Sequence, residues 1–170
     1  MQLLIGLGGN RGDVTGAFAG AVEALALEAR VLTRSSVWRS APLGPAQPDF
    51  LNAAVLVETA SHPRALLALC QALEAASGRA RDGETRWGPR TLDLDLLIVP
   101  GLVVQTPDLE LPHPRMAERR FALAPAAEVA PEWVHPRAHR TLGQLAADPA
   151  LVTQRCERVA PPGAWDAGKG

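Results

Sequence analysis

Two aspartates are the residues whose chemistry stands out in this sequence. Asp93 and Asp95 lie in the segment RWGPRTLDLDLLIV, which covers 86–99. If this segment is a β-strand, its side chains alternate between two faces, so both carboxylates share one face with their Cα atoms roughly 7 Å apart. Two carboxylates this close repel each other unless a cation or water lies between them. Mg²⁺ suits such a pair, because it commonly combines one or two carboxylates with substrate phosphates.

A basic segment directly precedes the two aspartates. Residues 79–90 contain several glycines and no apolar periodicity, so we expect a loop that closes over a nucleotide as a lid. Phosphate groups are best neutralised by metal ions and guanidinium groups together. The simpler alternative is an exposed edge strand that happens to carry two aspartates. The basic residues of the segment are Arg79, Arg81, Arg86 and Arg90.

The glycine-rich opening GLGGNRGD fits neither of two common phosphate-binding patterns. It lacks the Lys-Ser/Thr pair of a P-loop, and Arg11 stands where the third glycine of the dinucleotide-binding pattern belongs. We therefore interpret it as a tight turn beside the wall of a pocket.

The hydrophobic pattern predicts the elements that position these residues. Short apolar runs indicate strands at 2–8, 31–40, 50–58, 91–99 and 102–106. Helical spacing indicates helices from 13 to 25 and from 61 to 78, with shorter ones at 116–123 and 141–147. The order β-α-β-β-α-β specifies an α+β, ferredoxin-like fold, in which an antiparallel sheet carries two helices on one face. We expect one domain over 1–158, including a C-terminal extension, and a loose tail over 159–170.

Composition and charge limit the possible partners. The 170 residues are 47% hydrophobic and 21% charged, which is typical of a globular domain. A net charge of -1 provides no general attraction for nucleic acid or anionic lipid, so we expect neither as a partner. No apolar run approaches the ~20 residues of a membrane span, and no signal peptide is recognisable. We expect a cytoplasmic monomer that binds small molecules.

Three longer motifs resemble those of the 6-hydroxymethyl-7,8-dihydropterin pyrophosphokinase family. They are GPAQPDFLNAAVLVET, RWGPRTLDLDLL and LPHPRMAERRFALAPAAEVAP, in that family's order and approximate spacing, and the opening IGLGGNRGD is similar as well. The resemblance covers residues 3–145. It implies transfer of the β,γ-pyrophosphoryl group of ATP to the hydroxymethyl oxygen of the pterin, with release of AMP, in folate biosynthesis.

The resemblance also implies roles for individual residues. Asp93 and Asp95 match the positions that hold two Mg²⁺ ions on the ATP phosphates, and Arg79 and Arg90 match catalytic positions. Phe50 and Phe121 match the two rings that enclose the pterin, although tyrosine is common at position 50. The other matching pterin contacts are Ser40, Leu43 and Asn52. The matching ATP contacts are Glu74, Arg81, Trp87, Leu96, His113 and Arg119.

Three other functions fit parts of the sequence. A non-catalytic ferredoxin-like module for a small ligand explains the fold, but gives the aspartates and the arginine loop no role. An RNA-binding domain of similar topology needs exposed aromatic residues and a basic surface, whereas this chain has a net charge of -1 and no tyrosine. A D-x-D sugar-nucleotide transferase needs a longer nucleotide-binding domain. Detection of AMP as the product distinguishes the pyrophosphokinase from all three.

Overall fold

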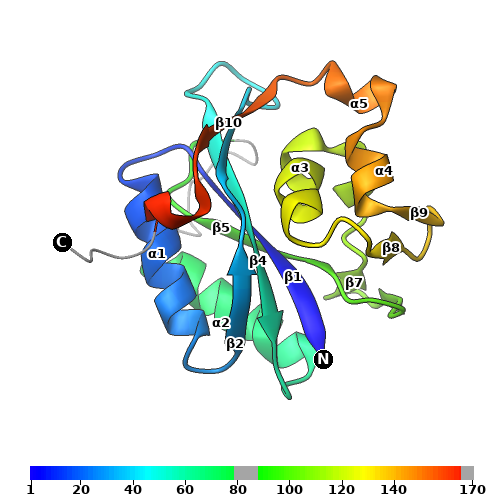
Figure 1. Ribbon diagram of the computed structural model, residues 1–170. Helices are drawn as coiled ribbons and strands as arrows, with labels where there is room; N and C mark the ends of the chain where they lie inside the picture. Colours follow the sequence, from blue (N-terminus) through cyan, green and yellow to red (C-terminus); the bar gives the residue numbers. More distant parts are fainter. Residues whose placement is uncertain (79–87, 166–170) are drawn as a thin grey trace.

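An antiparallel sheet forms the middle layer of the molecule, and helices cover both of its faces (Figure 1). The computed structural model describes residues 1–78 and 88–165. Its strands are β1 (Gln2–Gly9), β2 (Arg30–Arg34), β3 (Val37–Ser40), β4 (Phe50–Glu58), β5 (Asp93–Ile98), β6 (Val104–Gln105), β7 (Glu110–Leu111), β8 (Val134–His135), β9 (Arg140–Thr141) and β10 (Cys156–Ala160). Its α-helices are α1 (Val14–Leu25), α2 (Pro63–Ala76), α3 (Arg120–Val129), α4 (Leu142–Ala146) and α5 (Pro149–Val152), and its 3-10 helices are η1 (Met116–Glu118) and η2 (Pro162–Trp165).

Strand β1 lies inside the sheet, between β4 and β5. The strand order is β10-β3-β4-β1-β5, β2 also pairs with β4, and all of these pairings are antiparallel. The single strand predicted over 31–40 is interrupted between β2 and β3. At that break the Ser35 hydroxyl replaces a strand partner, because its Oγ accepts a hydrogen bond from the Ala54 backbone N–H at 2.8 Å. The predicted α+β class is confirmed.

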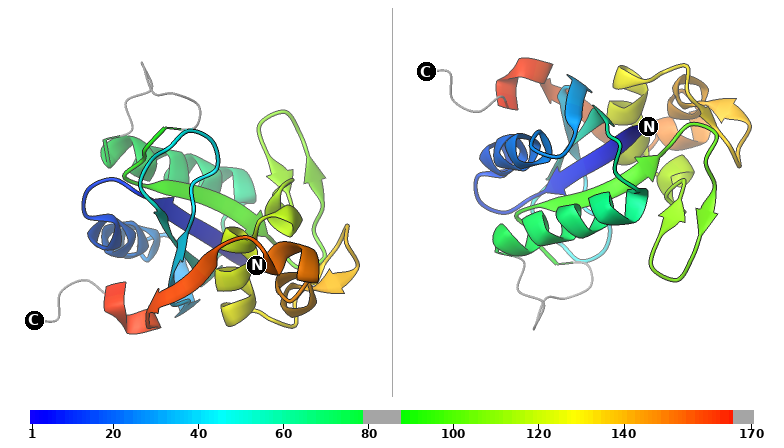
Figure 2. Two further views of the ribbon diagram at one scale, coloured as in Figure 1. Left: turned by 90° about the horizontal axis from the view of Figure 1, so that it is seen from above. Right: turned by 90° about the horizontal axis from the view of Figure 1, so that it is seen from below.

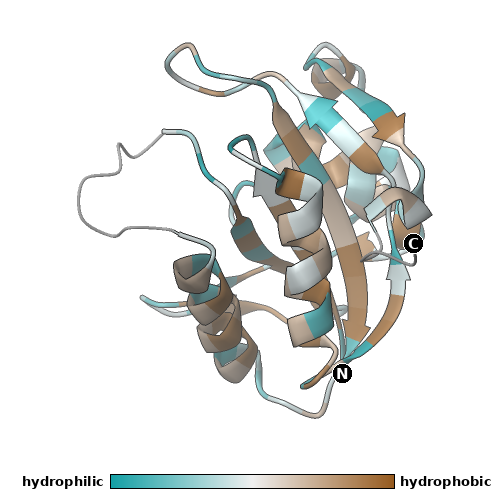
Figure 3. Cartoon of the chain, turned by 90° about the vertical axis from the view of Figure 1, so that its left-hand side faces the viewer, coloured by the Kyte–Doolittle hydropathy of each residue, from teal (hydrophilic) through white to brown (hydrophobic). Residues whose placement is uncertain are grey.

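Two hydrophobic layers separate the sheet from its helices. Helices α1 and α2 cover one face, as predicted, and α3 and α4 cover the other (Figure 2). Figure 3 shows hydrophobic colouring along the central strands, where both layers meet the sheet. The helix predicted over 116–123 instead comprises η1 and the start of α3, and α3 continues through Pro125 to Val129. None of the described helices combines the length and apolar character that crossing a membrane requires.

Strand β5 contains one irregularity that changes which side chains share a face. Strict alternation predicted that Leu92, Leu94, Leu96 and Ile98 lie together. The first three do pack under α1 and α2, but Ile98 packs with the α3 layer. The pairing with β1 shifts register at this point, so Leu97 is an extra residue that reverses the alternation. The prediction for Ile98 was therefore wrong.

One residue anchors the described segment after β10 to the core, while 161–164 are exposed. Trp165 is 1% exposed, and its ring meets Phe18 edge-on at a centroid distance of 5.7 Å. Its Nε1 donates a hydrogen bond to the Ser35 carbonyl oxygen at 3.0 Å. The expectation of a loose tail over 159–170 is therefore wrong up to Trp165, and 166–170 lie outside the described residues.

We predict that Trp165→Ala lowers the free energy of unfolding by about 3–5 kcal/mol, because it leaves a cavity beside Phe18 and removes a buried hydrogen bond. Urea unfolding followed by circular dichroism measures this loss. Val159→Ala is the control in the same segment, since Val159 is 38% exposed and its truncation should cost less than about 0.5 kcal/mol. Equal, small losses in both variants would show that the segment contributes little to the core.

Candidate active site

A pocket opens on the sheet face that α3 covers, where β1, β3, β4 and β5 come together. Its walls combine apolar rings, a buried amide and charged groups. Among its lining residues are Ser40, Leu43, Phe50, Asn52, Arg90, Asp93, Asp95, Arg119 and Phe121. All nine were predicted to contact substrate or metal, and the structure brings them together in one place. What each of them binds stays a prediction.

The floor of the pocket is strand β1, which carries glycine where a side chain would fill the space. Gly8 pairs with Asn52 on one side and with Asp93 on the other, and Gly6 pairs with Asp95. A Cβ placed on Gly8 would lie 3.7 Å from the Asn52 Oδ1 atom. Open space therefore remains between the amide on β4 and the carboxylates on β5. The strand predicted over 2–8 includes both glycines, and the structure extends it to Gly9. The turn interpreted from the opening GLGGNRGD therefore begins only after Gly9.

The two aspartates have different surroundings. Arg90 contacts Asp93 through Nη1, which lies 3.0 Å from both carboxylate oxygens, and about a quarter of each side chain is exposed. The side chain of Asp95 is 49% exposed, and its Oδ1 lies 4.0 Å from Nε2 of His113. Within the described residues, no group of three or more His, Cys, Asp and Glu side chains could hold a metal ion. A cation bound here would therefore take its protein ligands from the aspartate pair.

Arg119 brings a positive charge to the pocket, and His113 lies beside Asp95 without being part of the lining. Burial lowers the pKa of the His113 imidazole below its ordinary value, and the charges of Arg119 and Arg115 lower it further. His113 is therefore neutral at neutral pH, when it can both donate and accept a hydrogen bond. Burial also lowers the pKa of Arg119, although a guanidinium stays protonated under these conditions. The Arg119 guanidinium lies 5.5 Å from the centroid of the Phe121 ring and packs against it.

A buried amide faces the open space between the two phenylalanines. Asn52 is 5% exposed, and its Nδ2 donates hydrogen bonds to Ser40 Oγ at 2.9 Å and to the Trp38 carbonyl oxygen at 3.4 Å. These bonds turn Oδ1 toward the space above Gly8. Phe50 begins β4 and Phe121 lies in the first turn of α3, so the rings come from two different layers.

Some predicted site residues lie elsewhere. Glu74 is 5% exposed on α2, and its Oε1 accepts a hydrogen bond from the backbone N–H of Leu94 at 2.7 Å. Leu96 is 4% exposed and packs in the layer under α1 and α2, so it could reach a ligand in the pocket only through its main chain. Arg79, Arg81, Trp87 and most of the expected lid lie within 79–87, outside the described residues.

Asn10 connects two segments beside the pocket through hydrogen bonds that the sequence did not reveal. Its Nδ2 donates to Gln47 Oε1 at 3.0 Å and to the Pro48 carbonyl oxygen at 2.9 Å. Its Oδ1 accepts from the Arg90 backbone N–H at 2.8 Å. One side chain thus joins the loop before β4 to the segment that carries Arg90. No spacing rule predicts partners this far away in the sequence.

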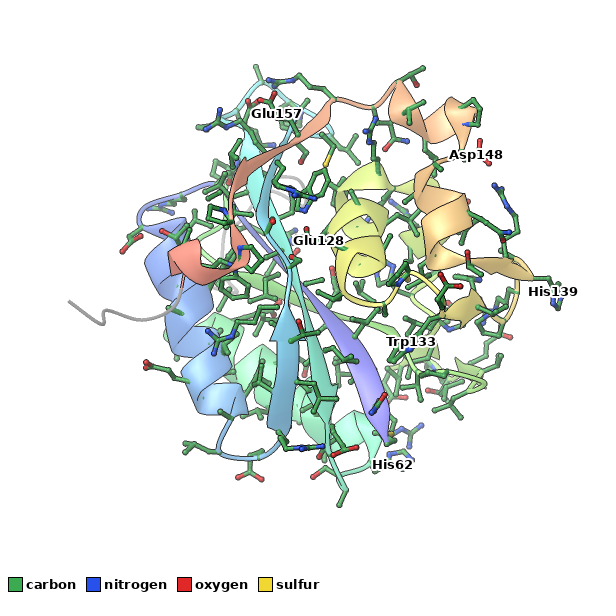
Figure 4. All side chains as sticks on the ribbon, viewed as in Figure 1. His62, Glu128, Trp133, His139, Asp148 and Glu157 are labelled. Carbon is green, nitrogen blue, oxygen red and sulfur yellow. The ribbon has the colours of Figure 1, made fainter. Side chains whose placement is uncertain are left out.

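Glu128 fixes α3 against the sheet. One carboxylate oxygen accepts hydrogen bonds from the Ser36 backbone N–H at 3.1 Å and from its hydroxyl at 2.7 Å. The other oxygen accepts from Trp38 Nε1 at 2.9 Å. Figure 4 labels Glu128 on the side of α3 that faces these strands. Phe121 lies seven positions before Glu128, on the same face of the helix. The contacts of Glu128 therefore help to fix the position of the Phe121 ring relative to the sheet.

Residues 4–131 match the family described as 7,8-dihydro-6-hydroxymethylpterin-pyrophosphokinase (HPPK). The chain belongs to this family. It is 44% identical over 144 residues to the 2-amino-4-hydroxy-6-hydroxymethyldihydropteridine pyrophosphokinase of Synechocystis sp., covering 84% of this chain and 73% of that protein. It is 47% identical over 133 residues to the protein of the same name from Methylorubrum extorquens, covering 76% of this chain and 83% of that one.

A solved structure shares the fold. The chain superimposes on wild-type Plasmodium falciparum HPPK-DHPS with a TM-score of 0.64 and 13% identity, over 85% of this chain and 40% of that chain. At this level of identity the likeness concerns the fold alone. The chain spans less than half the length of that protein.

We predict that Glu128→Ala lowers the free energy of unfolding by about 2–3 kcal/mol, because Ser36 and Trp38 then lose their charged acceptor while remaining largely enclosed. Glu157→Ala is the matched control. The Glu157 side chain is 60% exposed and lies 3.9 Å from Arg39, so its loss should cost less than about 1 kcal/mol. Chemical denaturation measures both values, and similar losses would refute a special role for Glu128.

Proposed function

We propose that this pocket transfers the β,γ-pyrophosphoryl group of ATP to the hydroxymethyl oxygen of 6-hydroxymethyl-7,8-dihydropterin and releases AMP. The protein is a pyrophosphokinase of folate biosynthesis, with ATP as its co-substrate. The main support for the residue assignments is that the residues predicted for phosphate and for pterin line the same pocket. Two aspartates and two arginines lie there beside two aromatic rings and a buried amide, so phosphate and pterin can meet.

The pterin binds between Phe50 and Phe121. A flat heteroaromatic ring is recognised by stacking together with a few hydrogen bonds at its edge. Asn52 Oδ1 is directed toward this space by the bond from Nδ2 to Ser40, so it accepts from an N–H group of the pterin edge. Leu43 is 51% exposed at the rim of the pocket, where the bound pterin would cover it.

Two Mg²⁺ ions bind at Asp93 and Asp95 together with the triphosphate. The residues fit this role, because both carboxylates line the pocket and Mg²⁺ takes its other ligands from phosphates and water. When bound, Mg²⁺ neutralises the charge of the transferred group and its leaving group. Arg90 orients Asp93 before ATP arrives, and its guanidinium has further N–H groups that can contact phosphate. His113 and Arg119 contact the nucleotide from the other side, with His113 neutral.

The reaction depends chiefly on alignment. A bond forms between the hydroxymethyl oxygen and the β-phosphorus, while the bond from the β-phosphorus to the oxygen shared with the α-phosphate breaks. AMP leaves with that electron pair, and the hydroxyl proton passes to a phosphate oxygen or to water. The stacked rings fix the pterin, and Arg90 and Arg119 neutralise the phosphates, so that the attacking oxygen and the leaving oxygen lie in line.

The direct test is to incubate the protein with Mg·ATP and 6-hydroxymethyl-7,8-dihydropterin and to identify the nucleotide product. AMP should appear in step with the pyrophosphorylated pterin. Formation of ADP would indicate transfer of a single phosphoryl group and contradict the proposal, as would absence of turnover.

We expect Asp93→Ala and Asp95→Ala each to reduce kcat by about 100-fold or more, because each removes a carboxylate that would hold the Mg²⁺ needed to neutralise phosphate charge. Steady-state assays at saturating Mg²⁺ and ATP measure the loss, and circular dichroism should show an intact fold, since removing one carboxylate also removes repulsion. Asp148→Ala is the control, because Asp148 pairs with Arg140 on the surface. Near-normal activity in both aspartate variants would overturn the metal assignment.

We expect Phe121→Ala and Phe50→Ala to weaken pterin binding by about 1–3 kcal/mol through loss of stacking and buried area, with little effect on ATP binding. Calorimetry with each ligand measures the two affinities. The chain contains three phenylalanines, and the third, Phe18, is fully buried in the core. Phe18→Ala should instead destabilise the fold. If Phe121→Ala unfolds the protein in the same way, Phe121 is a core residue rather than a pterin contact.

A further inference from the structure

Phe50 and Phe121, the two rings assigned to the pterin, lie on segments that are far apart in the sequence. Phe50 follows the loop 41–49, which also carries Leu43, and Phe121 lies in the first turn of α3. The distance between the rings therefore depends on how this loop and the start of α3 are placed relative to each other. Two adjacent residues of the C-terminal segment, Gln154 and Arg155, contact both.

Arg155 contacts the two ends of the loop 41–49. Its carbonyl oxygen accepts a hydrogen bond from the backbone N–H of Ala41 at 3.4 Å. Its guanidinium forms an ion pair with the carboxylate of Asp49. Ala41 and Asp49 are the first and last residues of the loop, so a single residue closes it at its base.

Gln154 contacts the start of α3. Its Oε1 accepts a hydrogen bond from the Arg120 backbone N–H at 2.9 Å. Its Nε2 donates to the Glu118 carbonyl oxygen at 2.9 Å. Arg120 is the residue directly before Phe121, and an N–H in the first turn of a helix has no partner within the helix itself. Gln154 thereby fixes the turn from which the Phe121 ring projects.

The main chain at 154–155 is itself held in place on both sides. Cys156 starts β10 and pairs with Ser40, the residue directly before the loop. On the other side, the Gln154 backbone N–H donates to the Leu151 carbonyl oxygen of α5 at 2.9 Å. The contacts at 154–155 thus connect two walls of the pocket through a segment that is part of the sheet. This segment lies outside residues 4–131, which match the family.

We propose that Gln154 and Arg155 are positioning residues that set the separation of the pterin-binding rings. This inference rests on the proposed function. Neither residue lines the pocket, so neither touches the substrate. Their effect is on the fraction of molecules in which the loop and the helix are correctly spaced, and the apparent affinity for the pterin falls with that fraction. On the ATP side, the pairing of β5 with β1 positions Asp93 and Asp95 and involves neither residue. Arg119 lies between the two residues that Gln154 contacts, and Asn10 links the loop to Arg90, so a smaller effect on ATP is expected as well.

The test uses the full chain with Arg155→Ala, Gln154→Ala and the double variant. We expect each single variant to raise the KM for the pterin by about threefold to tenfold, and the double variant to raise it more, because the competent fraction falls. The KM for ATP should rise less than the KM for the pterin, and kcat at saturating pterin should change by less than about twofold, because a bound pterin restores the spacing. Arg140→Ala is the control, since Arg140 makes a similar surface ion pair with Asp148 away from the loop.

A charge exchange separates positioning from general stability. Arg155→Asp and Asp49→Arg should each raise the pterin KM, and the two together should recover much of the loss, because the ion pair re-forms in reverse. A pterin KM equal to that of the unsubstituted protein in all variants would overturn the inference while leaving the proposed function intact. Absence of AMP formation by the unsubstituted protein would instead refute the proposed function. Equal increases in both KM values would show a merely structural role.

Discussion

The part of strand β1 that forms the floor of the pocket must carry no side chain on the pocket face. The rest of the site depends on this requirement. Leu3, Ile5 and Leu7 fill the core on one face of it, while on the other face Gly8 leaves open space and Gly6 lies against the Leu97 side chain. Hydrogen bonds to β4 and β5 keep this bare backbone in place on both sides. Polar groups on the neighbouring strands can then face a common space across it, and a side chain at either glycine would separate them.

Charge imposes the second constraint. Asp93 and Asp95 lie together on β5, where Arg90 pairs with Asp93, and Arg115 and Arg119 lie around η1. The fold keeps the like charges of each pair close together, and the ion pair with Arg90 offsets part of the repulsion between the aspartates. His113 lies between the two groups and stays uncharged, because burial and the arginines oppose its protonation. Binding a metal together with an anion relieves the repulsion on both sides at once.

The sequence predicted those features that depend on periodicity. The β-α-β-β-α-β order and the shared face of Asp93 and Asp95 follow from local spacing. The roles inferred for these residues came from the family motifs instead. The periodicity of residues also describes only one helix or strand at a time. It therefore failed at the extra residue in β5.

Contacts between distant segments were beyond the reach of the sequence for a different reason. Glu128 and Ser36 are 92 positions apart, and Trp165 and Ser35 are 130 apart. In each pair, a polar group requires a hydrogen-bond partner only after packing of the layers has removed it from water. The same holds for Asn10, whose partners lie on two loops. Such residues look like ordinary surface positions until the fold is known.

The position of β10 also decides how the sheet ends. Without it, β3 would present a free row of backbone N–H and C=O groups, which is a template for pairing with another chain. As the outermost strand, β10 carries the exposed side chains Glu157 and Arg158, and its register shifts before Ala160. Charge and irregular pairing both discourage the addition of a further strand. The C-terminal segment that contacts the loop 41–49 therefore also protects the molecule from edge-to-edge aggregation.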